Sequence, residues 1–125
     1  MSLSVLIADG NKDHAESLAL LVTAWGYDVY VCLEPEAALD FYCKFWPDVM
    51  LLDIGFPRRS DGLALVTEAK KLIRTKITTF IAITGHSDDQ TRAMAKEAGF
   101  YLYLVKPVDL DQLQAILEVL HKEIE

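Results

Sequence analysis

The sequence predicts an α/β fold in which a doubly wound, five-stranded parallel sheet of order 2-1-3-4-5 carries five helices on its two faces. Short apolar runs alternate five times with amphipathic stretches, which is typical of repeated βα units. One run, Val49–Leu52, shows no polar alternation, as expected for a central strand covered on both faces. Four of the runs end on a reactive polar residue, and in a parallel sheet such strand ends meet at one edge.

The strands are predicted from apolar runs that are bounded by polar or turn-forming residues. In chain order they are expected over Leu3–Ala8, up to Cys32, over Val49–Leu52, over Phe80–Ile83 and over Tyr101–Val105. Cys32 and Cys43, the second of which falls in a predicted helix, match no metal-binding spacing.

The helices are predicted from capping signals and apolar stripes. Three sites have a residue that can cap a helix N-terminus, followed three positions later by a side chain that can bond back to the capping residue. They are Asp13 with Glu16, Ser87 with Gln90, and Asp109 with Gln112. Pro35 can begin the second helix without its N–H, and Gly26 and Gly99 follow helical runs as residues that end helices. The stripes expected against the sheet are Leu18, Leu21 and Val22 over about residues 13–25, and Leu113, Ile116, Leu117 and Leu120 over about residues 109–122.

Length and composition bound the function. With 125 residues and 52% hydrophobic content the chain can bury one core, and we assign residues 1–125 to a single domain. The net charge of −7 disfavours direct nucleic-acid binding, because such surfaces neutralise phosphates with Lys and Arg. Asp9 interrupts the first apolar run too early for a signal peptide or a membrane span, so we expect a cytoplasmic location and no membrane partner.

Two of the polar strand ends are carboxylates. Asp53 follows four apolar residues and precedes a loop, so its carboxylate emerges from a dry strand and is the best nucleophile candidate. Asp9 ends the other expected central strand and should lie beside it. Adjacent carboxylates repel each other unless a cation lies between them, and Mg²⁺ favours one or two carboxylates with waters and phosphate oxygens. A simple capping role for Asp53 is the alternative.

The other two strand ends are a lysine and a threonine. Lys106 is followed by Pro107, which fixes a turn, and its ammonium is able to neutralise a phosphoryl oxygen on Asp53. Thr84 precedes Gly85 and offers a hydroxyl that can donate one hydrogen bond toward the same point. Either residue taken alone is more often structural, so the prediction depends on their convergence.

These stretches together resemble the receiver domain of two-component response regulators, which has a flavodoxin-like fold. The resemblance is carried by residues Val5–Asp9, Pro47–Asp53, Ile83–Gly85 and Lys106–Val108. It implies that Asp53 accepts a phosphoryl group from a histidine kinase or a phosphotransfer protein. It further implies that Lys106 contacts the phosphate and that Thr84 moves onto it.

The resemblance also implies a metal site, a switch and an output face. Mg²⁺ is expected at Asp9, Asp53 and Gly55. Tyr103 matches the aromatic switch residue of the family and would turn inward with Thr84, although an aromatic side chain packed on an outer strand is an equal alternative. A downstream effector protein would read the face formed by the fourth helix, the fifth strand and the fifth helix, and a homodimer is compatible with this arrangement.

The sequence departs from the family pattern at Gly10. The family usually has two adjacent acidic residues at the end of the first strand, and Asp9 matches the first of them, whereas a gap in the register would match it to the second. The missing carboxylate predicts weakened Mg²⁺ binding, because a hard cation loses an anionic ligand. We expect a nearby cation, Lys12 or Arg58, to fill part of the vacancy.

A second departure lies in the loop Pro57–Gly62, which is one residue longer than usual between Pro and Asp-Gly. Arg58 and Arg59 in this loop either attract a phosphate-bearing partner or are simply solvated.

The function predicted overall is that of a phosphorelay receiver whose only chemistry is its own phosphorylation and dephosphorylation, rather than an enzyme.

Other functions are open alternatives. The first is a degenerate receiver that binds partners without phosphorylation, which Gly10 favours and the retained Asp53, Thr84 and Lys106 oppose. A phosphatase of the haloacid dehalogenase type would use the first strand-end Asp and a second Asp two residues on, where this chain has Asn11. A flavodoxin-like cofactor site fits worse, because residues 9–13 present carboxylates where such a site needs N–H groups for phosphate.

Overall fold

The computed structural model describes residues 2–54, 59–72, 77–85 and 88–124. Its five strands form a parallel sheet in the order β2-β1-β3-β4-β5, which confirms the predicted topology. The strands are β1 (Ser4–Ala8), β2 (Asp28–Cys32), β3 (Val49–Leu52), β4 (Thr79–Thr84) and β5 (Leu102–Val105). The helices are α1 (Lys12–Ala24), α2 (Pro35–Phe45), α3 (Arg59–Lys70), α4 (Asp89–Ala98) and α5 (Leu110–Ile124). None of the described helices is long and apolar enough to cross a membrane.

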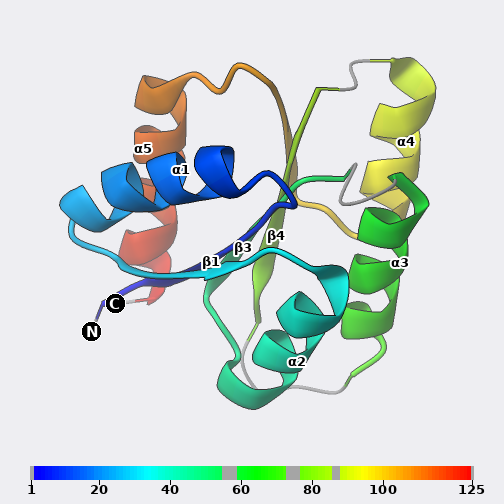
Figure 1. Cartoon of the computed structure of the whole chain (residues 1–125), viewed down its shortest axis with the longest axis horizontal. Helices are drawn as coiled ribbons and strands as arrows, with labels where there is room; N and C mark the ends of the chain where they lie inside the picture. Colours follow the sequence, from blue (N-terminus) through cyan, green and yellow to red (C-terminus); the bar gives the residue numbers. More distant parts are fainter. Residues whose placement is uncertain (1, 55–58, 73–76, 86–87, 125) are drawn as a thin grey trace.

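The helices cover both faces of the sheet, with α1 and α5 on one face and α2, α3 and α4 on the other (Figure 1). Successive residues of a strand point to opposite faces, so each central strand contributes to two apolar cores. In β1, Val5 and Ile7 pack with residues of α1 and α5, whereas Leu6 and Ala8 pack with residues of α2 and α3. The central strand β3 is at most 1% exposed at any position, as its unbroken apolar sequence predicts.

Two helices begin at residues other than the predicted ones. The N-cap of α1 is Asn11, which has an extended backbone and accepts a hydrogen bond from the N–H of His14 at 3.1 Å, so the predicted cap at Asp13 is wrong. The N-cap of α4 is Asp88, which accepts from the N–H of Thr91 at 2.8 Å, and the predicted cap Ser87 lies outside the described residues. In α1 the acceptor that comes earlier in the chain, Asn11, accepts from a free amide of the first turn, and in α4 the carboxylate of Asp88 does so.

The remaining helix signals mostly hold. Pro35 is the first residue of α2, and the residues that follow α1 and α4, Gly26 and Gly99, have left-handed φ angles of 100° and 116°. Asp109 caps α5 through the N–H of Gln112 at 3.1 Å.

The predicted apolar stripe of α1 is wrong at one position. Leu21 is 38% exposed, and the buried residues of this helix are Ala15, Leu18 and Val22. At 3.6 residues per turn these three lie in one line along the helix, while Leu21 lies beside that line and meets solvent. The stripe predicted for α5 is buried at Leu113, Leu117 and Leu120 and half-buried at Ile116.

Candidate functional site

The four polar strand ends meet at the carboxyl edge of the sheet. Asp9, Asp53 and Lys106 directly follow β1, β3 and β5, and Thr84 is the last residue of β4. The backbone pairing continues one residue past the strands, because the N–H of Asp53 donates to the carbonyl of Ala8 at 2.9 Å and that of Lys106 to the carbonyl of Thr84 at 2.8 Å. The parallel strands therefore place these four residues close together at one edge of the sheet.

Lys106 lies between the two carboxylates. Its Nζ donates to Asp53 Oδ2 at 2.9 Å and to Asp9 Oδ2 at 3.5 Å. The side chains of Asp9, Asp53 and Lys106 are 4%, 17% and 27% exposed, so the ion pairs are largely screened from bulk water. Partial burial lowers the pKa of Lys106, but the hydrogen bond and the charge of Asp53, joined by Asp9, outweigh it and raise the pKa above its usual value.

A fifth residue, His14, joins the site from the first turn of α1. Its Nδ1 lies 2.6 Å from Asp9 Oδ2, while the N–H of Asn11 donates to Asp9 Oδ1 at 2.9 Å. The role of His14 was not predicted from the sequence. The available signal is its position five residues after Asp9, in the first turn of the helix that follows this strand end, where side chains can reach back over the sheet edge.

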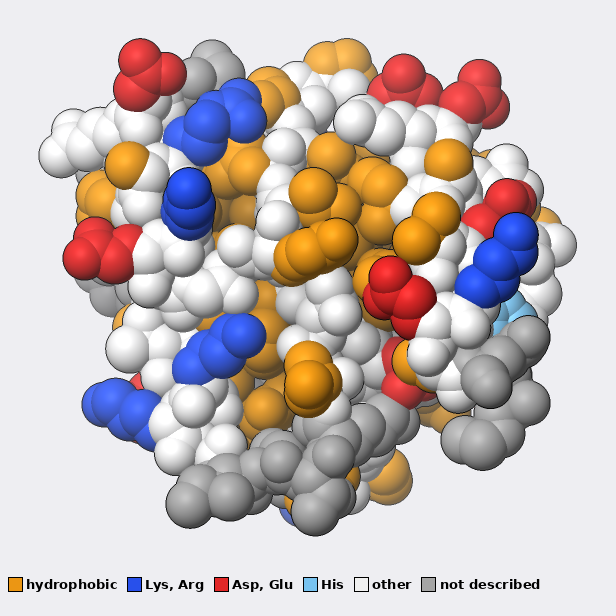
Figure 2. All heavy atoms as spheres, turned by 180° about the vertical axis from the view of Figure 1, so that it is seen from behind, with side chains coloured by type: hydrophobic (Ala, Val, Ile, Leu, Met, Phe, Trp, Pro, Cys, Tyr) orange, Lys and Arg blue, Asp and Glu red, His pale blue; other side chains and the backbone are white. Residues whose placement is uncertain are grey.

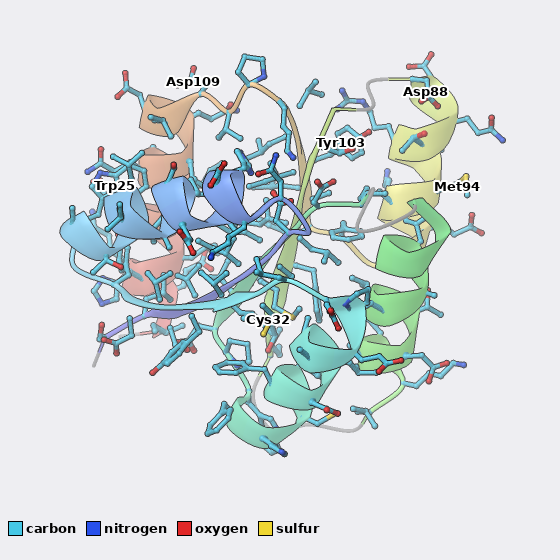
Figure 3. All side chains as sticks on the ribbon, in the orientation of Figure 1. Trp25, Cys32, Asp88, Met94, Tyr103 and Asp109 are labelled. Carbon is cyan, nitrogen blue, oxygen red and sulfur yellow. The ribbon has the colours of Figure 1, made fainter. Side chains whose placement is uncertain are left out.

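The two predicted switch residues lie on adjacent strands. Thr84 is fully buried, and Tyr103 on β5 is half-buried. Figure 3 shows Tyr103 on the side of the sheet that faces α4. The guanidinium carbon of Arg92, a residue of α4, lies 4.6 Å from the centre of the Tyr103 ring, which is the geometry of a cation–π contact.

Of the predicted cations, the structure places Lys12, which lies away from this cluster. Lys12 is 69% exposed and pairs with Glu16 at 3.9 Å, so it does not fill the vacancy at Gly10. Arg58 and Gly55 lie outside the described residues. Among the described residues, the side chain of α1 that contacts Asp9 is the imidazole of His14.

The oxygen ligands of the site are of the type that Mg²⁺ prefers, but they are few. Two carboxylates at one sheet edge are the hard oxygen ligands that this ion prefers. In the described part of the chain, however, no group of three or more His, Cys, Asp or Glu side chains is arranged to hold a metal. Gly10 contributes no side chain, so Asp9 and Asp53 would be the side-chain ligands.

A hollow lies beside Tyr103, between α4 and β5. Its lining includes Arg92, Lys96, Phe100, Tyr101 and Tyr103. Figure 2 shows hydrophobic side chains gathered over the middle of this side of the molecule, with Lys and Arg side chains along its left part, where α3 and α4 lie. The surface next to the switch residue is therefore apolar, and its border carries Arg92 and Lys96 together with Asp89.

Comparison with known proteins agrees with this architecture. The family model described as the response regulator receiver domain matches residues 5–118. The structure is similar to a response regulator receiver domain (CheY-like) from Methylobacillus flagellatus, with a TM-score of 0.82, 26% identity and coverage of 96% of this chain and 99% of that one. A two-component response regulator from Clostridium difficile shares the fold, with a TM-score of 0.89, 22% identity and coverage of 99% of both chains.

Curated relatives are longer proteins. The transcriptional regulatory protein ZraR of Escherichia coli (strain K12) is 31% identical over 94% of this chain, and the regulatory protein AtoC of the same strain is 27% identical over 91% of it. These alignments cover 26% and 24% of the two relatives, so the chain spans about a quarter of their length.

Proposed function

The chain belongs to the response regulator receiver family of two-component signalling, and on this basis we propose that Asp53 is its phosphoacceptor. The observation that carries the proposal is the convergence of Asp53 with a second carboxylate and a lysine ammonium at one sheet edge. Asp53 is the more accessible carboxylate, with 17% of its side chain exposed against 4% for Asp9, so an incoming phosphorus atom can reach it.

The proposed reaction is a phosphoryl transfer followed by hydrolysis. A carboxylate oxygen of Asp53 attacks the phosphorus of a phosphohistidine, so that an O–P bond forms as the N–P bond to the imidazole breaks. Lys106 already donates to this carboxylate and is in place to neutralise a phosphoryl oxygen. Water later attacks the acyl phosphate, which restores the carboxylate and releases inorganic phosphate. Mg²⁺, when held by Asp9 and Asp53, would supply further positive charge for the phosphoryl oxygens.

This chemistry needs no separate substrate beyond the phosphodonor. We therefore propose a signalling domain that undergoes its own phosphorylation and dephosphorylation, with a histidine kinase or a phosphotransfer protein as its donor. Receiver domains generally bind Mg²⁺ and interact with histidine kinases and effector domains. A cytoplasmic location stays a prediction from the sequence.

Thr84 and Tyr103 are the proposed switch. A phosphoryl group on Asp53 would draw the buried hydroxyl of Thr84 toward it, and the space that this movement leaves would favour an inward position of Tyr103. The half-buried Tyr103 ring under Arg92 supports this role, because it already lies at the boundary between the interior and the surface.

The face formed by α4, β5 and α5 is the proposed output surface. The hollow between α4 and β5 includes Tyr103 itself, so a movement of this ring would change the shape of the surface that a partner meets. ZraR is named as a transcriptional regulatory protein, but this chain matches only about a quarter of it. Because the chain is acidic, we do not propose that it contacts DNA directly. The partner proposed for this face is an effector protein, and a homodimer through it stays open.

Intact-mass measurement after incubation with acetyl phosphate tests the proposal. We expect the wild-type chain to gain the mass of one phosphoryl group, with and without Mg²⁺ compared, and the Asp53→Asn variant to gain none. Asp48→Asn is the matched control, because Asp48 is a buried aspartate whose carboxylate accepts from the backbone and hydroxyl of Ser4 rather than facing the site. Equal phosphorylation of the Asp53→Asn variant would refute the assignment.

A receiver that binds partners without phosphorylation is the second candidate. It is favoured by Gly10, which stands where the family usually has an acidic metal ligand, and by His14, whose ring already forms a hydrogen bond with the Asp9 carboxylate. A wild-type chain that takes up no phosphoryl group at any Mg²⁺ concentration, yet still binds its partner, would support this second function.

A further inference from the structure

The carboxylate of Asp9 is nearly saturated by donors from the protein itself. Its Oδ2 accepts from His14 Nδ1 at 2.6 Å and lies 3.5 Å from Lys106 Nζ, and its Oδ1 accepts from the N–H of Asn11 at 2.9 Å. A carboxylate offers about four lone-pair positions, and three are engaged here. The side chain is only 4% exposed, so few water molecules can share it.

His14 is the donor that is particular to this arrangement. The Nδ1 contact is the shortest of the three, and an ionised carboxylate only accepts, so the bond requires a hydrogen on Nδ1. The backbone N–H of His14 is itself held by the Asn11 side chain, which fixes the first turn of α1 over the strand end. His14 is thus held at both its backbone and its ring.

We propose that His14 is a positioning residue that competes with a divalent metal ion for Asp9. Lys106 bridges Asp9 Oδ2 and Asp53 Oδ2, so Oδ2 is the oxygen of Asp9 that faces Asp53. A metal ion bound to this oxygen between the two carboxylates must displace or share the hydrogen bonds from His14 and Lys106. On this proposal, weak metal binding would have two causes: the missing carboxylate at Gly10 and the hydrogen bond from His14 to Asp9. The inference rests on the proposed function, because it concerns the metal site of the same phosphoacceptor centre.

The alternative role would be supportive. A hydrogen bond from a neighbouring group can also orient a carboxylate for a metal, in which case removal of His14 would weaken metal binding. The geometry favours competition, because His14 and Lys106 both approach Oδ2 while the other oxygen is already held by Asn11. Little of the carboxylate is left for the metal.

Direct metal titration of the unphosphorylated chain tests the proposal. Metal-free protein is titrated with MgCl₂ in a calorimeter at constant ionic strength and pH, and binding of Mn²⁺ is followed independently by water proton relaxation. Removing one competing hydrogen bond predicts that the dissociation constant of His14→Ala falls about three- to tenfold below the wild-type value. His14→Leu, which removes the donor but keeps the bulk, should show the same fall.

Two control variants separate the ring from general effects of charge. Lys12→Gln removes an exposed cation from the same turn of α1, and His121→Ala removes an imidazole that contacts Tyr27 on a distant part of the fold. Neither should change the dissociation constant by more than about 1.5-fold, because the exposed charge of Lys12 is screened by solvent and His121 contacts Tyr27 rather than Asp9.

The outcomes are distinct. Unchanged or weaker metal binding in His14→Ala would overturn the inference, and tighter binding in His14→Ala but not in His14→Leu would do so too, because it would point to freed space. The titration needs no phosphoryl transfer. A chain that shows the shift but gains no phosphoryl mass would refute the proposed function and leave the competition standing, and the reverse result would refute the competition alone.

Discussion

Lys106 Nζ donates to Asp53 Oδ2 at 2.9 Å, across 53 positions of sequence. The contact joins the ends of two strands that are not neighbours in the sheet, because β4 lies between β3 and β5. A long side chain is needed to span that distance, and its ammonium then forms ion pairs with both Asp53 and Asp9. The proposed chemistry starts from this preorganised ion pair.

The stability that Lys106 confers should be lost at high pH. Asp53 and Asp9 outweigh the effect of partial burial and raise the pKa of Lys106 above its ordinary value of 10.5. A raised folded-state pKa of a cation adds stability that is complete below the unfolded pKa and lost as the pH rises through the folded pKa. We expect the difference in free energy of unfolding between wild type and Lys106→Met to stay constant while the pH is well below the ordinary lysine pKa of 10.5, and to shrink as the pH rises above it.

Urea denaturation in the presence of EDTA, followed by Trp fluorescence, measures this difference. Lys122→Met is the control, because Lys122 is an exposed residue of α5 and its removal should matter little at any of these pH values. A difference that grows with pH would contradict the assigned ion pair.

Loss of the Thr84 hydroxyl should uncouple phosphorylation from the switch. Thr84→Val keeps the shape of the side chain but removes the group that would follow the phosphoryl oxygens, so Asp53 should still be phosphorylated while Tyr103 stays in its resting position. With 3-fluorotyrosine in the chain, the Tyr103 signal is assigned by Tyr103→Phe and compared before and after phosphorylation. Thr79→Val, at the opposite end of β4, should switch like wild type.

Arg92 should hold the resting position of Tyr103. A partly exposed cation–π contact contributes about 0.5–1 kcal/mol, so Arg92→Gln should shift the resting population of Tyr103 about two- to fivefold toward the inward position. The same fluorine signal in unphosphorylated protein reports the shift. Lys96→Gln changes a charge one turn further along α4, in the lining of the same hollow, and should leave the signal in place. An unchanged signal in Arg92→Gln would show that the contact has no influence on the ring.

Gly62 should tolerate no side chain. A Cβ atom at this position of α3 would lie 2.6 Å from the carbonyl oxygen of Ile54, which belongs to the backbone just after Asp53. We expect Gly62→Ala to lower the free energy of unfolding by about 1–3 kcal/mol in urea denaturation, as overpacked sites do. Gly85→Ala is the matched control, because a Cβ there meets nothing within 4 Å. Equal stability of the two variants would contradict the close approach of α3 to the backbone of Ile54.

Much of the fold was predictable because its signals are local. Apolar runs, capping residues and left-handed glycines each depend on a few neighbouring positions, and the alternation of strands and helices indicates a parallel, doubly wound sheet, for which 2-1-3-4-5 is one of the common strand orders. The errors are local as well: Asn11 rather than Asp13 caps α1, and Leu21 lies beside the buried stripe. Such choices between adjacent residues depend on the entry angle of the helix, which the sequence pattern does not record.

The residues of the site divide in the same way. The sequence by itself determined that two carboxylates, a hydroxyl and an ammonium stand at the ends of strands, because strand periodicity and parallel topology bring those ends to one edge. Only the tertiary structure decided which donors hold Asp9. The first turn of α1 places His14 on this carboxylate and leaves Lys12 in solvent, because helix packing on the sheet sets the distance from each side chain to the strand end.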